Sequence, residues 1–273
     1  MKHIYLLLLF IPLSILNCSI ENDESESIGL DDIKYQELSL DISGMNTYGN
    51  IYYPKDYIEG KSYPLVIMSH SANINSDSLK TYAQRTALIG YLVYCFDYPG
   101  SSSSSRSEDI DNCTIFTEAE TLKEIIDYFV SQDEVDNIYL FGTSMGGAVS
   151  SLVAEERQDE ISGLILFYPA YNICELLVKY PINVSEEYLE QLTDYDIYEH
   201  IGTFNKDVLI VHGKNDFLVP YSYSEKASEL YSSCELVLVE GANHGFNKDN
   251  YYFNNQYDQE TWSYAESYLL NHR

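Results

Sequence analysis

Short apolar runs and amphipathic stretches alternate along most of the chain. Six predominantly apolar runs are typical of strands buried on both faces of a sheet. These runs are 63–68, 92–96, 137–141, 163–167, 208–211 and 236–239. Stretches with helical character lie between or after them, at 78–89, 117–130, 145–157, 223–231 and 261–270. This alternation predicts an α/β fold, with a mostly parallel sheet and helices on both faces.

Before these runs, residues 33–42 and 47–53 alternate polar and apolar positions on either side of a Ser43-Gly44 turn. Such alternation is typical of antiparallel strands with one face in water. We therefore expect an antiparallel hairpin to open a single domain that covers residues 33–273.

One interval, 169–205, interrupts the alternation, with no clear strand and an uneven helical pattern around 186–192. It follows a predicted core strand on the side where parallel strands end, which is where binding sites of such folds lie. We interpret it as a small lid over a site. The alternative is an excursion over the surface.

The first 17 residues have the layout of a secretory signal, with Lys2 followed by an apolar run at 4–16 that is too short to span a bilayer. The run ends in Leu16-Asn17-Cys18, which resembles a bacterial lipoprotein signal whose Cys18 becomes lipidated. Asn17 departs from the small residue usual there, so ordinary cleavage with an incidental Cys18 is the alternative. Residues 18–32 follow as an acidic tether. We expect an exported protein, either lipid-anchored in the cell envelope or secreted.

Charge and cysteine usage exclude several classes of function. Fifteen Lys and Arg against 43 Asp and Glu give a formal net charge of −28, which repels nucleic acids and anionic membranes. We expect no nucleic-acid partner, and membrane contact only through a lipid on Cys18. The five cysteines form no CxxC pair and no Cys/His cluster of zinc-site spacing, so no metal is expected. Oligomeric state and disulfide pairing cannot be predicted from the sequence.

The run 137–141 leads into Gly142-Thr143-Ser144-Met145-Gly146, a G-x-S-x-G motif between a predicted strand and a predicted helix. In this context the serine occupies a sharp turn that exposes its hydroxyl, and glycines give the backbone the necessary clearance. We predict that Ser144 is a nucleophile. A tight structural turn is the alternative.

A serine nucleophile needs a histidine base and a carboxylate that orients it. Asp216 lies in the loop after the run 208–211, and His244 lies in the loop after 236–239. We predict these two residues as the acid and the base. The other candidates are His3 in the signal, His200 in the lid, His212 at a strand end, His272 near the terminus, and the carboxylates Asp207 and Asp249.

Acyl transfer also requires hydrogen-bond donors for the developing oxyanion. The backbone N–H of Met145, directly after the nucleophile, is one candidate. The second is the backbone N–H of Ala72, in the loop that follows the run 63–68.

The segments 64–70, 97–100, 142–147, 212–220 and 241–244 resemble the α/β-hydrolase superfamily. Within it they are most similar to bacterial feruloyl (cinnamoyl) esterases and to serine-aminopeptidase-like, S33-type hydrolases. The resemblance covers nearly all of residues 33–273. Two loops depart from the family pattern: Ser71 replaces the glycine after His70, and 97–103 lacks the usual D-x-x-G-x-G-x-S arrangement.

These observations predict a serine hydrolase that cleaves a small-molecule carboxylic ester through an acyl-enzyme and needs no cofactor. The resemblance favours esters as substrates. A peptidase or amidase of the aminopeptidase-like branch is the first alternative. A binding protein that retains the fold without turnover is the more distant one.

Overall fold

The computed structural model describes residues 29–101, 114–180, 185–248 and 257–273. The predicted signal, most of the acidic tether, Cys18 and Asp249 lie outside the described residues. Their assignments stay predictions.

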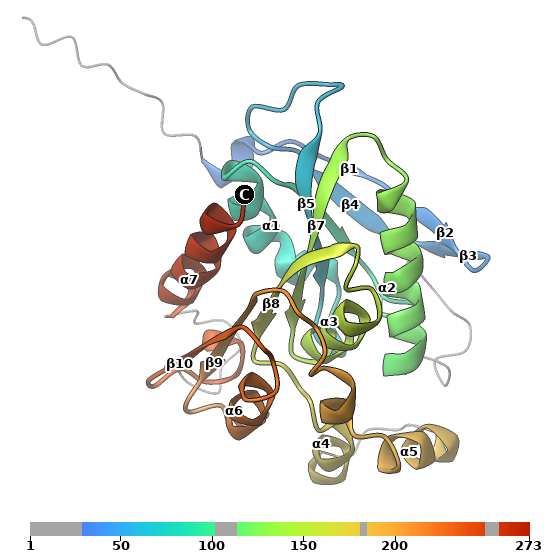
Figure 1. Ribbon diagram of the computed structural model, residues 1–273, viewed down its shortest axis with the longest axis vertical. Coiled ribbons are helices and arrows are strands. Elements are labelled where there is room, and N and C mark those ends of the chain that lie inside the picture. The colour runs from blue at the N-terminus through green and yellow to red at the C-terminus, as the bar shows by residue number, and fades with distance from the viewer. Residues whose placement is uncertain (1–28, 102–113, 181–184, 249–256) are drawn as a thin grey trace, which may run out of the picture.

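An eight-stranded sheet forms the centre of the molecule, in the order β1-β4-β6-β5-β7-β8-β9-β10 (Figure 1). Strands β5 to β10 pair in parallel, whereas β1 and β4 add two antiparallel pairings at one edge. The strand bounds are β1 Tyr35–Glu37, β4 Gly49–Tyr52, β5 Tyr63–Ser69, β6 Leu92–Phe96, β7 Val135–Thr143, β8 Ile161–Phe167, β9 Val208–Gly213 and β10 Cys234–Val239. The predicted mostly parallel sheet with an antiparallel amino-terminal part is confirmed.

The predicted hairpin divides between two sheets. β2 (Leu40–Ile42) and β3 (Met45–Thr47) form a separate antiparallel pair around the Ser43-Gly44 turn. The outer parts of the same hairpin, β1 and β4, pair within the main sheet. Ser43 and Gly44 both have positive φ, of 51° and 81°, which is the backbone geometry that a tight hairpin turn requires.

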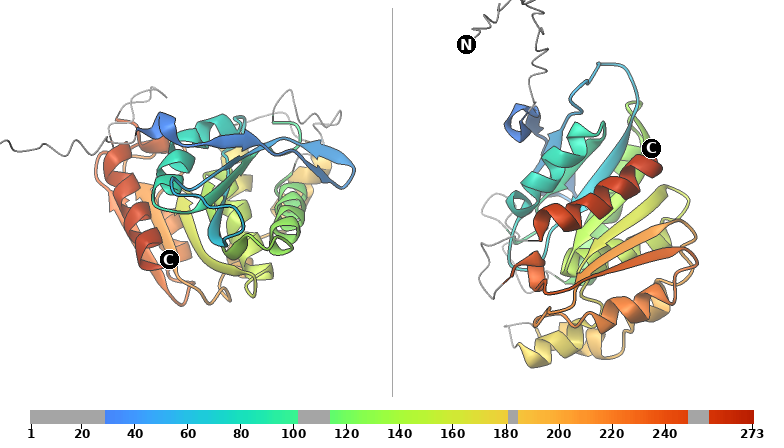
Figure 2. Two further views of the ribbon diagram at one scale, coloured as in Figure 1. Left: turned by 90° about the horizontal axis from the view of Figure 1, so that it is seen from above. Right: turned by 90° about the vertical axis from the view of Figure 1, so that its left-hand side faces the viewer.

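Helices cover both faces of the sheet. α1 (Lys80–Leu88) and α7 (Asp258–Asn271) pack on one face, where alternate strand residues such as Val66 and Phe141 contact them. α2 (Ile115–Val130) and α3 (Met145–Glu156) pack on the other face, against Leu65 and Leu140. The right-hand view of Figure 2 shows α1 and α7 together in front of the sheet. The sequence predicted all four helices to within a few residues.

The interval after β8 contains three short helices, α4 (Ile173–Lys179), α5 (Glu186–Thr193) and η4 (Ile197–His200). They lie at the end of the molecule where α3 begins, together with α6 (Ser222–Ser228) (Figure 1). α5 coincides with the predicted helical pattern, whereas α4 was not predicted. Its sequence signal is Asn172, whose side chain caps the helix by accepting a hydrogen bond from the Glu175 N–H.

Three further 3-10 turns complete the described elements, at η1 (Leu30–Asp32), η2 (Ser76–Leu79) and η5 (His244–Phe246).

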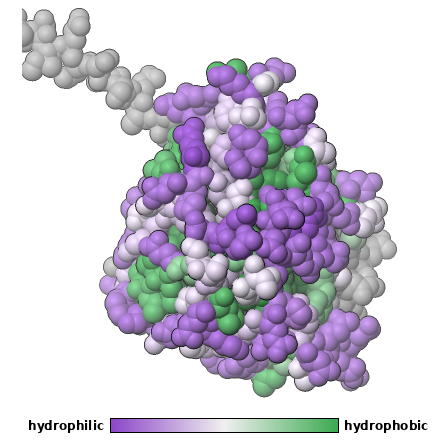
Figure 3. Space-filling view, in the orientation of Figure 1, coloured by the Kyte–Doolittle hydropathy of each residue, from purple (hydrophilic) through white to green (hydrophobic). Residues whose placement is uncertain are grey.

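Polar residues dominate the visible surface, with smaller apolar patches between them (Figure 3). None of the helices in the described ranges is long and apolar enough to cross a bilayer. Cys95, Cys174 and Cys234, which the structure describes, are free thiols.

Candidate active site

Ser144 occupies a sharp turn between β7 and α3. Its φ of 51° and ψ of −117° are unfavourable for a residue with a side chain, so the surrounding structure must hold this conformation. The neighbouring glycines explain how the turn fits. A Cβ at Gly142 would lie 2.4 Å from the Gly146 carbonyl oxygen, and a Cβ at Gly146 would lie 2.4 Å from the carbonyl oxygen of His70. The turn therefore requires both glycines of the motif.

Backbone hydrogen bonds anchor this turn to the neighbouring strand. The Ser144 N–H donates to the Phe167 carbonyl at 2.9 Å, and the Ser144 carbonyl accepts from the Ala170 N–H at 3.0 Å. The hydroxyl itself makes no hydrogen bond to any residue that the structure describes. A hydroxyl without a fixed partner is compatible with a nucleophile, because catalytic hydrogen bonds often tighten only when substrate is bound.

Asp216 and His244 come together although 28 residues separate them along the chain. Asp216 lies beyond the end of β9, and His244 lies in η5 beyond the end of β10, which is the next strand of the sheet. The distance from Asp216 Oδ2 to His244 Nδ1 is 2.7 Å. The other carboxylate oxygen, Oδ1, accepts the backbone N–H groups of Leu218 and Val219 at 2.9 and 2.8 Å. The carboxylate is therefore fixed on both of its oxygens.

The environment of Asp216 keeps its carboxylate ionised. Burial by itself would raise its pKa, but hydrogen bonds and electrostatic interactions with His212 and His244 outweigh burial and lower the pKa to about 2. An ionised carboxylate only accepts hydrogen bonds, so the hydrogen of a neutral His244 ring resides on Nδ1. The other ring nitrogen, Nε2, is then free to accept a proton, as a general base must.

Asn243 and Tyr168 hold the His244 loop in place. The Asn243 side-chain oxygen accepts the backbone N–H of His244 at 2.8 Å and that of Phe217 at 3.1 Å, which ties the two candidate catalytic loops together. Tyr168, the first residue after β8, packs its ring against the imidazole, with centroids 4.7 Å apart. The sequence did not predict this contact with His244, although the position of Tyr168 directly after a core strand is the signal that could have identified it.

The loop predicted to supply the second oxyanion donor packs against the nucleophile segment. The Ser71 hydroxyl lies 3.0 Å from the Thr143 hydroxyl and donates to the Thr143 carbonyl at 3.3 Å. Within the described residues, the backbone N–H groups of Ala72 and Met145 have no hydrogen-bond acceptor. Two unoccupied donors in the loops that flank Ser144 are what an oxyanion requires.

His70 holds this loop in place through hydrogen bonds of both ring nitrogens. Its Nε2 accepts the Tyr98 N–H at 3.1 Å, so Nδ1 carries the hydrogen and donates to the Ser71 carbonyl at 2.8 Å. Burial lowers its pKa, which favours the neutral ring. We therefore interpret His70 as a structural residue that links the end of β5 to the loop after β6.

The other candidate acids and bases occupy different places. His200 stacks on Tyr195, with ring centroids 4.4 Å apart. His272 pairs with Asp207 at 2.9 Å, on the carboxy-terminal helix. His212 is completely buried, and its Nε2 lies 3.3 Å from Asp216 Oδ2. His3 lies outside the described residues.

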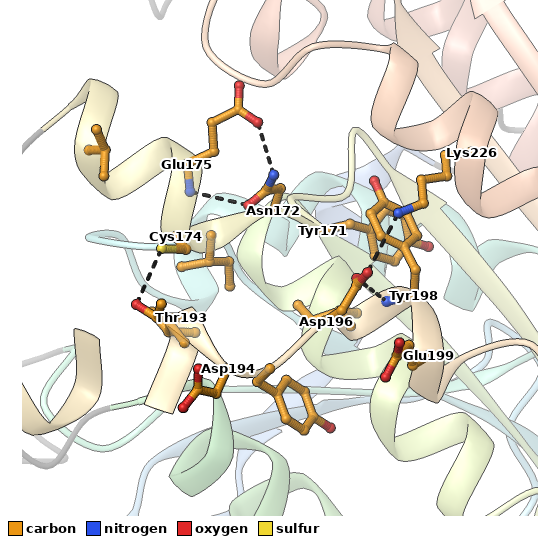
Figure 4. Close-up of a pocket in the computed structure, with 15 residues that line it drawn as sticks. Tyr171, Asn172, Cys174, Glu175, Thr193, Asp194, Asp196, Tyr198, Glu199 and Lys226 are labelled. Atoms are coloured by element: carbon orange, nitrogen blue, oxygen red, sulfur yellow. Dashed lines mark hydrogen bonds and ion pairs between the residues drawn. The ribbon is translucent and has the colours of Figure 1, made fainter. Parts of the chain in front are cut away.

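A separate cavity of about 600 Å³ lies between α4, α5, η4 and α6 (Figure 4). Acidic side chains line it, and its one cationic side chain, Lys226, already contacts Asp196 and the ring of Tyr198. Ser144 and His244 are not among its lining residues. Within the described part of the chain, no group of three or more His, Cys, Asp or Glu residues is arranged to hold a metal ion.

Comparisons with known proteins agree with this architecture. The serine aminopeptidase S33 family matches residues 60–195. Monoglyceride lipases from Rattus norvegicus and Mus musculus are 28% and 27% identical over 137 and 141 residues. Each alignment covers 50% of this chain, but it spans only 44% of the relative.

Among solved structures, Est1E from Butyrivibrio proteoclasticus with bound ferulic acid superimposes with a TM-score of 0.73 at 23% identity, over 86% of this chain and 98% of that one. A monoacylglycerol lipase from Paleococcus ferrophilus superimposes with a TM-score of 0.65 at 17% identity, over 84% of this chain and all of that one. The chain has the α/β-hydrolase fold, as its motifs predicted.

Proposed function

We propose that this protein is a serine hydrolase that cleaves carboxylic esters, with Ser144 as nucleophile, His244 as base and Asp216 as the orienting acid. One observation carries the proposal. The structure places a hydrogen-bonded Asp216–His244 pair and a strained serine turn at the same end of one sheet. The first would supply a base in the correct tautomer, and the second would supply an exposed hydroxyl.

The proposed reaction has two steps. In the first, Ser144 Oγ attacks the ester carbonyl carbon while His244 Nε2 takes the hydroxyl proton, and the backbone N–H groups of Met145 and Ala72 stabilise the oxyanion. The C–O bond to the alcohol then breaks, and His244 returns the proton to the departing alcohol. In the second, water attacks the acyl-enzyme with His244 again as base, which releases the acid and restores the Ser144 hydroxyl.

The structural and sequence relatives support an ester as the substrate. Ferulic acid is bound to Est1E, and the curated relatives are named as monoglyceride lipases. The ring of Tyr168 beside His244 offers an aromatic surface at the reacting centre. These features favour carboxylic esters with a longer acyl chain or an aromatic acyl group.

The test is hydrolysis of p-nitrophenyl acetate, a longer acyl ester and methyl ferulate by wild type, Ser144→Ala and Ser150→Ala. Ser150 is the matched control, because it is a fully buried serine of the same helix whose hydroxyl has no hydrogen-bond partner within the described residues. We expect ester cleavage by wild type and Ser150→Ala, and none above background by Ser144→Ala with an unchanged melting temperature. Activity in folded Ser144→Ala would contradict the proposal.

A second candidate function is cleavage of amino-acyl amides, which the match to the serine aminopeptidase family favours. Turnover of an amino-acyl anilide without turnover of simple esters would establish it. A protein that binds without catalysis would instead leave a serine-directed fluorophosphonate unreacted at Ser144.

A further inference from the structure

We propose that His212, held by Ser224, is a positioning residue that fixes the Asp216 carboxylate in the orientation which His244 requires. This inference rests on the proposed function, in which Asp216 orients the base. It concerns a histidine that does not reach the reacting atoms and would act only through Asp216.

The first reason is that His212 holds Asp216 by two routes. Its Nε2 lies 3.3 Å from Asp216 Oδ2, the same oxygen that receives the His244 Nδ1 hydrogen. Nε2 also lies 3.1 Å from the carbonyl oxygen of Val219, whose own N–H donates to Asp216 Oδ1. His212 therefore contacts one carboxylate oxygen directly and anchors the residue that binds the other.

The second reason is that the hydrogen of His212 can be assigned from its partners. Both atoms near Nε2, the Val219 carbonyl oxygen and Asp216 Oδ2, are acceptors, so Nε2 carries a hydrogen. In the neutral ring Nδ1 is then an acceptor, and the Ser224 hydroxyl 2.7 Å away can donate to it. The Val219 carbonyl thus fixes the tautomer that places an N–H beside Asp216, and the Ser224 hydroxyl satisfies the other ring nitrogen.

The third reason is complete burial. His212 and Ser224 are both 0% exposed, so water cannot replace either hydrogen bond. A buried carboxylate is costly unless donors surround it, and four donors, two backbone and two imidazole, face Asp216. Without His212, Oδ2 would keep a single partner, and the carboxylate would be held less firmly in the orientation that His244 requires.

Among the residues that the structure describes, the following charged and titratable groups surround this network. Asp216 faces His212 and His244, and the Tyr168 ring faces His244 from the end of β8. Asp258 on α7 acts on Tyr168 from further away. A change in the His244 Nδ1–H resonance after substitution of His212 would therefore report on Asp216, the group that both histidines contact.

The test compares His212→Gln, His212→Asn and Ser224→Ala in the full chain. A glutamine amide nitrogen can reach the position of Nε2 and still donate toward Asp216 and Val219, whereas the shorter asparagine reaches only the position of Nδ1. We expect His212→Asn to lower kcat about tenfold with little change in KM, as for the loss of one hydrogen bond to a charged group. His212→Gln should recover most of this loss, and Ser224→Ala should show a smaller decrease. His272→Gln, at the distant histidine paired with Asp207, is the matched control and should behave as wild type.

The second readout is the hydrogen-bonded Nδ1–H proton of His244, followed by NMR on histidine-labelled protein. Loss of a donor makes the Asp216 carboxylate more basic and changes its hydrogen bond to His244, so this resonance should move from its wild-type position in His212→Asn. Equal kcat and an equal His244 Nδ1–H resonance in folded wild type, His212→Asn and His212→Gln would overturn the proposal. If neither His212 variant folds, a folded Ser224→Ala with wild-type kcat and resonance would overturn it instead.

The NMR arm separates this inference from the proposed function. A wild type that hydrolyses no ester would refute the proposed function, yet the His244 Nδ1–H resonance would still report whether His212 orients Asp216. Conversely, active wild type with an indifferent His212→Asn would refute the positioning role alone.

Discussion

At the scale of single residues, the acid that orients His244 can be distinguished from its rival. Asp216→Asn should lower kcat by roughly 10³- to 10⁴-fold, because an amide that donates to Nδ1 favours the wrong imidazole tautomer. Asp207→Asn is the matched control, since Asp207 also pairs with a histidine but directly precedes β9, whereas Asp216 follows that strand. Steady-state kinetics on the ester panel measures both variants. Full activity in Asp216→Asn would transfer the role to another carboxylate.

A second residue-scale prediction concerns Glu118 on α2. It is buried, its Oε2 has no hydrogen-bond partner in the described structure, and burial raises its pKa from 4.5 to about 8. The folded state therefore holds a proton that the unfolded state releases above pH 4.5. The stability that this neutral form provides is complete below pH 4.5 and is lost as the pH rises to about 8.

Replacement of Glu118 by Gln should remove this loss of folding stability at rising pH. Relative to wild type, Glu118→Gln should gain stability progressively between pH 5 and pH 8, by on the order of a few kcal/mol at the upper end. Denaturant unfolding at several pH values measures it. Glu120→Gln makes the same change on an exposed turn of the same helix and should show no such trend. Parallel pH profiles for wild type and Glu118→Gln would contradict the prediction.

At the scale of elements, the loop after β5 is coupled to the nucleophile turn through Ser71. Its hydroxyl bonds to Thr143, the residue before Ser144, in place of the glycine that the family pattern has at this position. Ser71→Ala should lower kcat about three- to tenfold with a small change in KM, because a neutral hydrogen bond that positions the Ala72 N–H is lost. A double-mutant cycle with Thr143→Ser, which keeps the partner hydroxyl, and Thr143→Val, which removes it, tests the pairing. Additive losses in the cycle with Thr143→Val would rule out this coupling.

For single strands and helices, the local sequence pattern predicted the core strands and α2 but not α4. The core strands and α2 were recognisable because apolar side chains must face the core, which gives buried strands continuous runs and helices a stripe at a spacing of three to four residues. Leu122, Ile125, Ile126 and Phe129, which share one predicted face, are all buried. α4 escaped prediction because its seven residues leave only Ile173 buried, so packing imposes no regular pattern on it.

At the scale of the whole molecule, the sequence of the amino-terminal segment predicts a lipid anchor on Cys18. If Cys18 is lipidated, Cys18→Ser should move the protein from the membrane fraction to the soluble fraction after expression in a bacterium. Cys174→Ser, at a free cysteine of α4, is the control and should leave the distribution unchanged. Fractionation followed by immunoblotting measures both. Cys18→Ser retained in the membrane would contradict the lipoprotein interpretation.

The sequence by itself determined the class of fold and the candidate nucleophile, acid and base. Alternating strands and helices allow few arrangements, and functional residues of such a sheet follow the ends of its strands. Ser144, Asp216 and His244 each follow a different strand, so their positions could be inferred without knowing any distance.

Only the tertiary structure decided which groups share Asp216. His212 belongs to β9 and Ser224 to α6, and no spacing in the sequence indicates that both histidines meet one carboxylate oxygen. The same holds for Tyr168 against His244 and for Ser71 against Thr143. These contacts depend on how neighbouring strands align and on side-chain rotamers, which are set by packing across the whole domain and leave no periodic trace in the chain.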